Sequence, residues 1–325
     1  MEKFSMLEKY NQVRQNSFFV LQKAKHVVIK EEELLAFAQS IPLKKVFESY
    51  QWEAPFHFLG KGKDLLNYIF TVDTINFGSG FSPEIQKKTG NSIYAFVASG
   101  LKKAMLSGID LSPQWAAGIT LKKLQDLFEL EHKELLSQFS LCLQETGEFV
   151  VQKYQGEYSH LLESLPKNKK GNALISLLVE NCPHWNDCGF YQKERVSFYK
   201  RAQILVNDLY LGFQGTTFGD FDDIGRLTMF ADNLVPHVLF CEGILEYSPF
   251  LKEQIEKKEF LESYSEEEIE IRAGAIVSVE KIVEFWNQNR ETNLFPCMID
   301  VYLWNLGHEA HYKKIPRHLT KTFFY

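Results

Sequence analysis

The sequence predicts a mainly α-helical protein with few short strands. Apolar residues recur at helical spacing along several long stretches, whereas alternating strand patterns are rare. No internal repeat, low-complexity tract or long linker rich in Pro, Gly or Ser interrupts the chain. The length of 325 residues exceeds that of a typical domain. We expect a single domain over 1–325, which could be built as two packed helical lobes with a boundary near 166–172, where the basic loop "PKNKKGN" lies.

The first elements along the chain are a short strand and a long helix. "HVVI" at 26–29 is the clearest strand pattern. Helical periodicity then extends over 123–154, and Gly147 within this stretch predicts the end of the helix, because glycine is favoured at helix ends.

Two further helices follow in the second half of the chain. The segment 196–213 places an apolar stripe on one face, and Lys200 and Arg201 begin the other face. The segment 263–286 begins with Ser265 and has a glutamate three residues later, which is the pattern of a capping box. Its apolar residues recur at helical intervals, at Ile276, Val279, Val283 and Trp286.

Between these helices, "FGDFDDIGRLTMFADNLVP" at 218–236 combines carboxylates with many apolar residues. Pro236 lacks an N–H and suits the first turn of a helix, so we expect that helix to be capped near Asn233 and to end near Gly243. Asp232 then precedes the helix N-terminus, where the helix dipole favours an ionised carboxylate. Such a group can simply cap the helix, or it can face a cavity and stabilise a cation there.

Composition and charge limit the possible classes of function. Hydrophobic residues make up 45% and charged residues 24%, an ordinary balance for a soluble globular protein. A formal net charge of -6 disfavours DNA or RNA partners, which require a basic surface to neutralise phosphates. No apolar run approaches the ~18 residues that span a bilayer, and the charged N-terminus does not resemble a signal peptide. We therefore expect a cytoplasmic protein without a membrane or nucleic-acid partner.

The cysteines and histidines do not form a clear metal motif. The five cysteines are mostly far apart, which is typical of reduced thiols. "CPHWNDC" at 182–188 contains His184 but lacks a second ligand pair at zinc spacing, so a loop near the core is favoured over a metal site. His308 and His311 could also be ligands, although a solvated pair is the simpler interpretation. We expect neither a metal nor a cofactor.

Several motifs, in order along nearly the whole chain, resemble the queuosine salvage protein family. They are "KHVVIKEEELLAFAQSI", "DTINFGSG", "YKRAQILVNDL", "FDDIGRLTMFADNLVPHVLFCEGILEYS", "EIEIRAGAIVSVE", "IDVYLWNLG" and "PRHLTKTFFY". The combination of "LTMFAD" with "VP" is the most diagnostic. The resemblance implies a helix-rich fold similar to that of DNA glycosylases, with the active site in a central cleft. It also implies hydrolysis of the N-glycosidic bond of queuosine 5′-monophosphate, which releases the 7-deazaguanine base queuine for salvage into tRNA modification.

The resemblance places Asp232 at the catalytic position, "FAD" before "VP". Cleavage of a C1′–N bond builds oxocarbenium character on the ribose, which a carboxylate can stabilise. Asp232 could also bond transiently to C1′ or orient the attacking water, and these roles remain open. Because the leaving base lacks N7, its negative charge must be relieved by polar groups elsewhere on its edge.

Further substrate-binding positions carry over from the family. His57 in "WEAPFHF" matches a histidine that contacts the base, Phe230 matches a position that lines the base pocket, and Asp300 matches an aspartate that binds the ligand. Taken alone, His57 and Phe230 would be interpreted as core residues. Asn305 stands where some relatives have an acid, so it keeps an acceptor and loses a charge.

Other matched positions are expected to shape the site. Asp223 fits the family's "F-x-D" pattern and is expected to order its loop. Asp73 and Asn76 match "D-x-x-N-F", although "GSGF" then replaces the aromatic residues of relatives. Lys200 and Arg201 could bind the 5′-phosphate, or they could belong to a solvated helix face or an internal ion pair.

Two alternatives come from other classes of function. A nucleic-acid base glycosylase would agree with the implied fold, but the acidic charge and the absence of an "LPGVG"-type hairpin disfavour it. A non-catalytic helical module could instead bind a nucleoside in an aromatic pocket, and only a search for released base would distinguish it from an enzyme.

Overall fold

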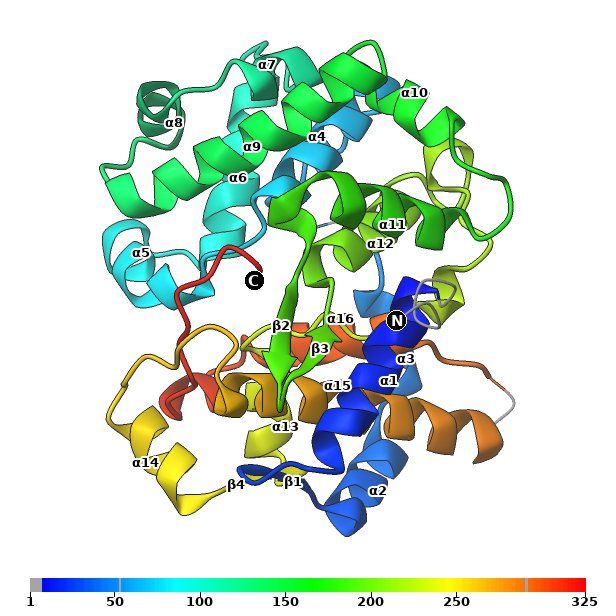
Figure 1. Ribbon diagram of the computed structural model, residues 1–325, viewed down its shortest axis with the longest axis vertical. Helices are drawn as coiled ribbons and strands as arrows, with labels where there is room; N and C mark the ends of the chain where they lie inside the picture. The colour runs from blue at the N-terminus through cyan, green and yellow to red at the C-terminus, as the bar shows by residue number, and fades with distance from the viewer. Residues whose placement is uncertain (1–7, 53, 290–291) are drawn as a thin grey trace. The chain divides into compact units, whose positions relative to one another are not determined.

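A computed structural model describes residues 8–52, 54–289 and 292–325. It confirms the mainly α-helical class, because helices dominate and the strands are few and short (Figure 1). The chain divides into two compact units. The first unit consists of Met1–Tyr50, Asp187–Lys200 and Gly225–Lys321, and the second consists of Gln51–Asn186, Arg201–Ile224 and Thr322–Tyr325.

The first unit packs its helices around one long buried helix, α15. Its elements are α1 Lys9–Leu21, β1 Val27–Ile29, α2 Glu31–Ser40, α3 Leu43–Ser49, β2 Cys188–Tyr191, β3 Glu194–Ser197, α13 Val235–Cys241, β4 Leu245–Tyr247, α14 Pro249–Glu256, α15 Glu266–Asn289 and α16 Pro296–Leu306. Helices α1, α2, α13 and α16 all contact α15. The expected stripe of α15, at Ile276, Val279, Val283 and Trp286, is buried.

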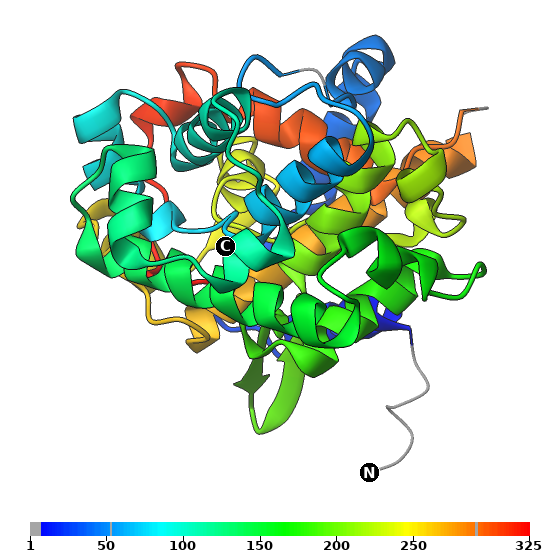
Figure 2. The ribbon, with the colours of Figure 1, turned by 90° about the horizontal axis from the view of Figure 1, so that it is seen from above.

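The strands of the first unit form two antiparallel pairs. The predicted strand β1 pairs with β4, with Val28 opposite Glu246. Strands β2 and β3 form a hairpin that the sequence did not indicate, with Gly189 opposite Val196, visible as two green arrows in Figures 1 and 2.

The described residues of the second unit form helices and loops, without a strand. Its helices are α4 Gly62–Thr74, α5 Ser82–Thr89, α6 Ile93–Leu106, α7 Pro113–Ala117, α8 Leu121–Phe128, α9 Lys133–Lys153, α10 Tyr158–Glu163, α11 Lys170–Asn181 and α12 Lys200–Gly212, whose first residue is assigned to the first unit. Residues 166–172 lie inside this unit, where they lead into α11. The helix expected at 196–213 begins later than expected, at Lys200, because residues 196–197 end strand β3 of the first unit. Its expected stripe is buried at Ala202, Leu205, Val206 and Leu209.

The helix expected over 123–154 is wrong in two respects. The chain breaks between α8 and α9 at Glu129, whose φ of 50° lies in the left-handed region. Helix α9 then continues through Gly147 to Lys153. A Cβ at Gly147 would lie 2.4 Å from the backbone N of Ala117, so this glycine allows α7 to pack closely against α9.

The helix after Pro236 also begins differently from the expectation. Asn233 does not cap α13, because its side-chain amide donates to the carbonyl of His318 at 3.3 Å. Asp232 accepts from the first backbone N–H groups instead. The helix ends at Cys241, close to Gly243, whose φ of 76° explains the stop predicted there.

Candidate active site

The segment 230–232 in the first unit is held in place at each of its residues. The N–H of Phe230 donates to Asp300 Oδ1 at 2.9 Å. The carbonyl of Ala231 accepts from Arg272 Nε at 3.0 Å. Oδ1 of Asp232 accepts from the N–H groups of Leu234 and Val235 at 2.8 and 3.0 Å. Asp300 and Arg272 are buried. Their charged side chains fix the backbone at the N–H of Phe230 and at the Ala231–Asp232 peptide, directly before Asp232.

The two oxygens of the half-buried Asp232 carboxylate differ. Oδ1 is engaged by the two backbone N–H groups, which also fixes the rotamer of the side chain. Oδ2 has no hydrogen bond to any residue that the structure describes. The carboxylate can therefore cap α13 with one oxygen and keep the other for a ligand, which makes the two interpretations of this residue compatible.

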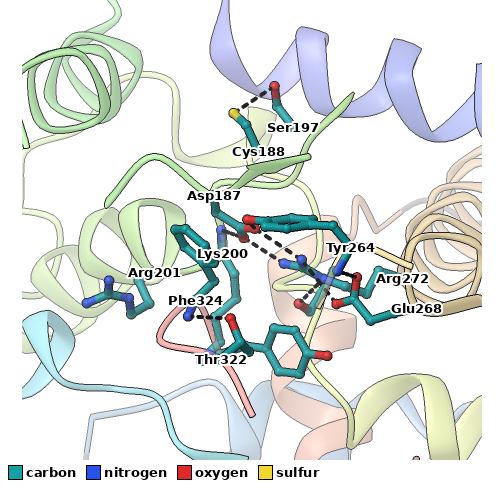
Figure 3. A network of polar contacts seen from close by, with 12 residues as sticks. Asp187, Cys188, Ser197, Lys200, Arg201, Tyr264, Glu268, Arg272, Thr322 and Phe324 are labelled. Carbon is teal, nitrogen blue, oxygen red and sulfur yellow. Dashed lines mark hydrogen bonds and ion pairs between the residues drawn. The ribbon is translucent and has the colours of Figure 1, made fainter. Parts of the chain in front are cut away.

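Arg272 belongs to a buried ionic network (Figure 3). Its guanidinium binds both carboxylate oxygens of Asp187, at 3.0 and 2.6 Å, and lies 3.5 Å from Glu268 Oε1. The hydroxyl of Tyr264 also donates to Asp187, at 2.8 Å. Only half of the expected capping box forms: the N–H of Glu268 donates to Ser265 Oγ at 3.3 Å, but the N–H of Ser265 donates to the Glu262 carbonyl, and the Glu268 side chain accepts from the N–H of Tyr264 at 3.2 Å. Arg272 was not singled out from the sequence, although an arginine within the apolar stretch of a helix is a detectable signal.

Of the other sequence-predicted residues of the first unit, Phe230 and Asp300 lie at the Asp232 segment and Asn305 does not. Asn305 is exposed on α16, five residues after Asp300, which is about 140° away around the helix. Lys200 is buried, and its N–H donates to Asp187 Oδ2 at 3.1 Å at the start of α12.

A second arginine, Arg317, interacts electrostatically with Asp232. Burial lowers the pKa of Arg317, and the charge of Asp232 acts in the opposite direction and raises it. Burial likewise lowers the pKa of His308, and the charge of Asp232 opposes this shift by raising the pKa. Nδ1 of His308 lies 2.8 Å from the Trp304 carbonyl. Arg317 was not singled out from the sequence, since nothing in "PRHLT" distinguishes it from a surface arginine.

In the second unit, His57 is buried in an aromatic cluster. Its ring stacks on Trp52 with centroids 3.9 Å apart, and burial lowers the pKa of His57 from 6.5 to about 4. Nδ1 lies 2.7 Å from the Trp52 carbonyl, which can only accept, so Nδ1 carries the proton of the neutral ring. Nε2 lies 2.9 Å from the hydroxyl of Tyr94 and is therefore an acceptor.

Asp73, Asn76 and Arg201 lie around the end of α4. Asn76 Nδ2 donates to Asp73 Oδ1 at 3.2 Å, and Asp73 is fully buried. The guanidinium of Arg201 donates to the carbonyls of Thr74 and His184. Its Cζ lies 5.0 Å from the ring centre of Phe77 and 5.1 Å from that of Trp185, a setting that anchors the side chain within the second unit. Neither Lys200 nor Arg201 lies on the solvated helix face that was one of the expectations.

The side chain of Asp223 lies at the N-terminus of α11. It accepts from the N–H groups of Gly171 and Asn172 at 2.8 and 2.9 Å. The adjacent Asp222 accepts from those of Lys169 and Lys170 at 3.0 and 3.2 Å, and the first of these bonds lowers the pKa of Asp222. These contacts join the segment 217–224 to α11, as an ordering role for Asp223 requires.

The cysteine motif at 182–188 provides no assembled metal centre. Cys182 is buried, and Cys188 Sγ donates to Ser197 Oγ at 3.3 Å across the hairpin. Within the described ranges, no group of three or more His, Cys, Asp or Glu side chains is arranged to hold a metal ion. None of the described helices is both long enough and apolar enough to cross a membrane.

Comparison with known proteins places these residues in a family. The family model "Queuosine salvage protein" matches residues 56–325. A protein of Sphaerobacter thermophilus named queuosine 5′-phosphate N-glycosylase/hydrolase is 32% identical over 311 residues, which cover 94% of this chain and 95% of the relative. Proteins with the same name from Nematostella vectensis and Mus musculus are 32% and 28% identical, each over 96% of this chain and 98% of the relative. The chain therefore belongs to the queuosine salvage protein family.

Proposed function

We propose that the protein hydrolyses the N-glycosidic bond of queuosine 5′-monophosphate and releases queuine, with Asp232 as the catalytic carboxylate. The observation that carries the proposal is the hydrogen bonding of the Asp232 carboxylate. One oxygen accepts from two backbone N–H groups, and the other has no hydrogen bond within the described residues. The full-length similarity to relatives named for this reaction supports the same assignment.

The reaction needs a negative charge beside the ribose. As the C1′–N bond lengthens, the bonding electrons move to the base and positive charge develops on C1′ and the ring oxygen. Asp232 stabilises this charge with Oδ2, either electrostatically or through a transient bond to C1′. Water then adds its oxygen to C1′, and the base takes up a proton.

The precise position of the carboxylate matters for this role, because electrostatic stabilisation depends on groups fixed before the reaction. Asp300 and Arg272 act as positioning residues in the proposal, since each holds the backbone of the segment 230–232. Neither is assigned a contact with the reacting atoms.

The substrate in this proposal is a free nucleotide and not a nucleic acid, and the reaction uses only water as a second reactant. The net charge of -6 supports a small substrate, because it disfavours binding along a phosphate backbone.

The test is direct. Chelator-treated protein is incubated with queuosine 5′-monophosphate, and free queuine is measured by mass spectrometry. We expect release of queuine that is proportional to the protein concentration and absent from a heat-denatured control. If no base appears over hours at micromolar protein, the activity is not the one proposed.

A further inference from the structure

The chain directly before Asp232 is buried, yet it belongs to neither a helix nor a strand. Residues 227–231 are all buried and have no regular secondary structure. Backbone N–H and C=O groups in such a stretch need partners from other parts of the protein, because they have none in a helix or a sheet. Asp300 and Arg272 meet this need near the end of the stretch, at the Phe230 N–H and the Ala231 carbonyl.

The start of the same stretch is held by Arg14, in the middle of α1. Nη1 of Arg14 donates to the carbonyl of Arg226 at 2.8 Å, and Nη2 donates to the carbonyl of Leu227 at 3.2 Å. Nε lies 2.9 Å from Oε1 of Glu280 on α15. All three nitrogens of the planar guanidinium therefore have a partner, which fixes its orientation as well as its position.

These contacts are not those of an ordinary surface ion pair. The side chains of Arg14 and Glu280 are only 21% and 18% exposed. Burial raises the pKa of Glu280, and the charge of Arg14 opposes this shift by lowering the pKa. The neighbouring pair of Arg226 with Glu8 is different, because the Arg226 side chain is 48% exposed and such pairs contribute little. Arg14 is therefore the side chain of α1 that holds the start of the stretch.

Helix α15 anchors both ends of the stretch. Arg272 binds the Ala231 carbonyl directly, and Glu280 reaches the Leu227 carbonyl through Arg14. The eight helical positions from 272 to 280 span about 12 Å along the axis. The four residues from 227 to 231 span about 13 Å when extended. The two lengths agree, so the stretch can follow α15 in the antiparallel direction while it is held at both ends.

Helix α1 is itself fixed on α15, so Arg14 is a firm support. The two helices pack against each other within the first unit (Figure 1). The face of α1 that carries Tyr10, Val13, Ser17 and Val20 is buried. Arg14 follows Val13 directly, at the edge of this buried face.

We propose that Arg14 is a positioning residue for the reaction, because it holds the backbone that carries Asp232 through the Arg226 and Leu227 carbonyls. The inference rests on the proposed function and assigns Arg14 no contact with the substrate. A carboxylate stabilises a developing cation best when its position is fixed before the reaction. Release of the start of the stretch should therefore lower kcat and leave KM and the affinity for free queuine nearly unchanged.

The first test compares variants of Arg14 and Glu280 at a temperature at which each is folded. We expect Arg14→Met to lower kcat about 10- to 100-fold, the scale for misplacing a reacting group by a fraction of an ångström to 1 Å. Arg14→Lys keeps the charge but cannot donate to both carbonyls in the same fork, so its kcat should be intermediate. Lys281→Gln is the matched control, since it removes an ion pair between α15 and Glu31 of α2 and should keep the wild-type kcat.

A double variant separates position from stability. Arg14→Met leaves the Glu280 carboxylate without the guanidinium that binds it, so the thermal midpoint should fall. Arg14→Met with Glu280→Gln removes that charge, and its midpoint should rise again while kcat stays low. If kcat recovers together with the midpoint, Arg14 acts on stability alone and the inference is wrong.

Coupling to Asp232 is the second test. In an Asp232→Asn background, Arg14→Met should lower the remaining rate much less than it does in the wild type, because the carboxylate that Arg14 positions is gone. The same fold-loss in both backgrounds would show that Arg14 acts independently of Asp232, which would overturn the inference.

A third readout does not depend on turnover. Amide hydrogen exchange over 227–235 includes Leu234 and Val235, whose N–H groups bind Asp232 Oδ1. Exchange there should be faster in Arg14→Met than in the wild type, and unchanged in Lys281→Gln. If the wild type releases queuine and a folded Arg14→Met variant keeps its kcat, only the positioning role is wrong. If the wild type releases no queuine, the proposed function is wrong, and unchanged exchange in Arg14→Met would then also refute the hold of Arg14 on this stretch, whereas faster exchange would support it.

Discussion

Replacing Arg272 with methionine should destabilise the protein severely. The side chain is 1% exposed, and its partners Asp187 and Glu268 are 2% and 0% exposed. Arg272→Met removes two hydrogen bonds to Asp187 and one to the Ala231 carbonyl, while methionine keeps most of the apolar volume. Two buried carboxylates then lose the guanidinium that binds them. Removing one partner of a buried ion pair costs about 3–5 kcal/mol, a large fraction of a typical free energy of unfolding of about 5–15 kcal/mol.

The measurement is urea unfolding followed by circular dichroism, with Arg226→Met as the matched control. Arg226 pairs with Glu8 at 2.8 Å, but its side chain is 48% exposed, so the control should lose less than about 1 kcal/mol. Asp187→Asn is the complementary variant, because it weakens the network but leaves the bond from Arg272 to Ala231 possible. If Arg272→Met and Arg226→Met lose the same free energy of unfolding, the buried network does not stabilise the first unit in the way described.

Two further predictions concern the second unit. Gly147→Ala should lower the free energy of unfolding by about 1–3 kcal/mol or more, because the new Cβ would lie 2.4 Å from Ala117 N and 2.6 Å from Pro113 O. Gly118→Ala is the control, because its Cβ would meet nothing nearer than 3.4 Å. Thermal melts of the two variants check this, and equal midpoints would contradict it. Burial lowers the pKa of His57 from 6.5 to about 4, so the unfolded chain binds a proton that the folded chain does not bind between these pH values. The free energy of unfolding should therefore be greatest above about pH 6.5 and decrease as the pH falls toward 4. His57→Gln should flatten this dependence when thermal midpoints are compared across that range, and an unchanged slope would show that His57 titrates normally.

Local patterns in the sequence predicted the elements that depend on local interactions. The strand at Val27–Ile29, the serine cap at Ser265, and the buried stripes of α12 and α15 all follow from periodicity and capping chemistry. The errors arose where distant residues decide. Gly147 resembles a helix end in sequence, but packing against α7 accounts for it. Asn233 resembles a cap, but its amide binds the carbonyl of His318.

The candidate site was predictable only in part, for the same reason. Asp232 could be singled out because a proline four residues later fixes where the helix begins. The residues that hold or surround it come from far along the chain: Arg272 lies 41 positions away from the Ala231 carbonyl that it binds, and Asp300 lies 70 positions from Phe230. The units are themselves assembled from separate segments, since Asp187–Lys200 belongs with Met1–Tyr50. No periodicity reports such pairings.

The most direct test of the account is the turnover of Asp232→Asn, measured with its thermal midpoint and its affinity for free queuine. The asparagine oxygen can still accept from Leu234 and Val235, so the midpoint should stay close to that of the wild type. Queuine carries no ribosyl cation, so its affinity should change little, while release of queuine from queuosine 5′-monophosphate should fall by about 10²- to 10³-fold. Asp222→Asn is the matched control, because Asp222 also accepts from backbone N–H groups at a helix N-terminus, and it should keep the wild-type rate per folded molecule. A folded Asp232→Asn variant that turns over at nearly the wild-type rate would contradict the account and leave Asp232 as a helix cap alone.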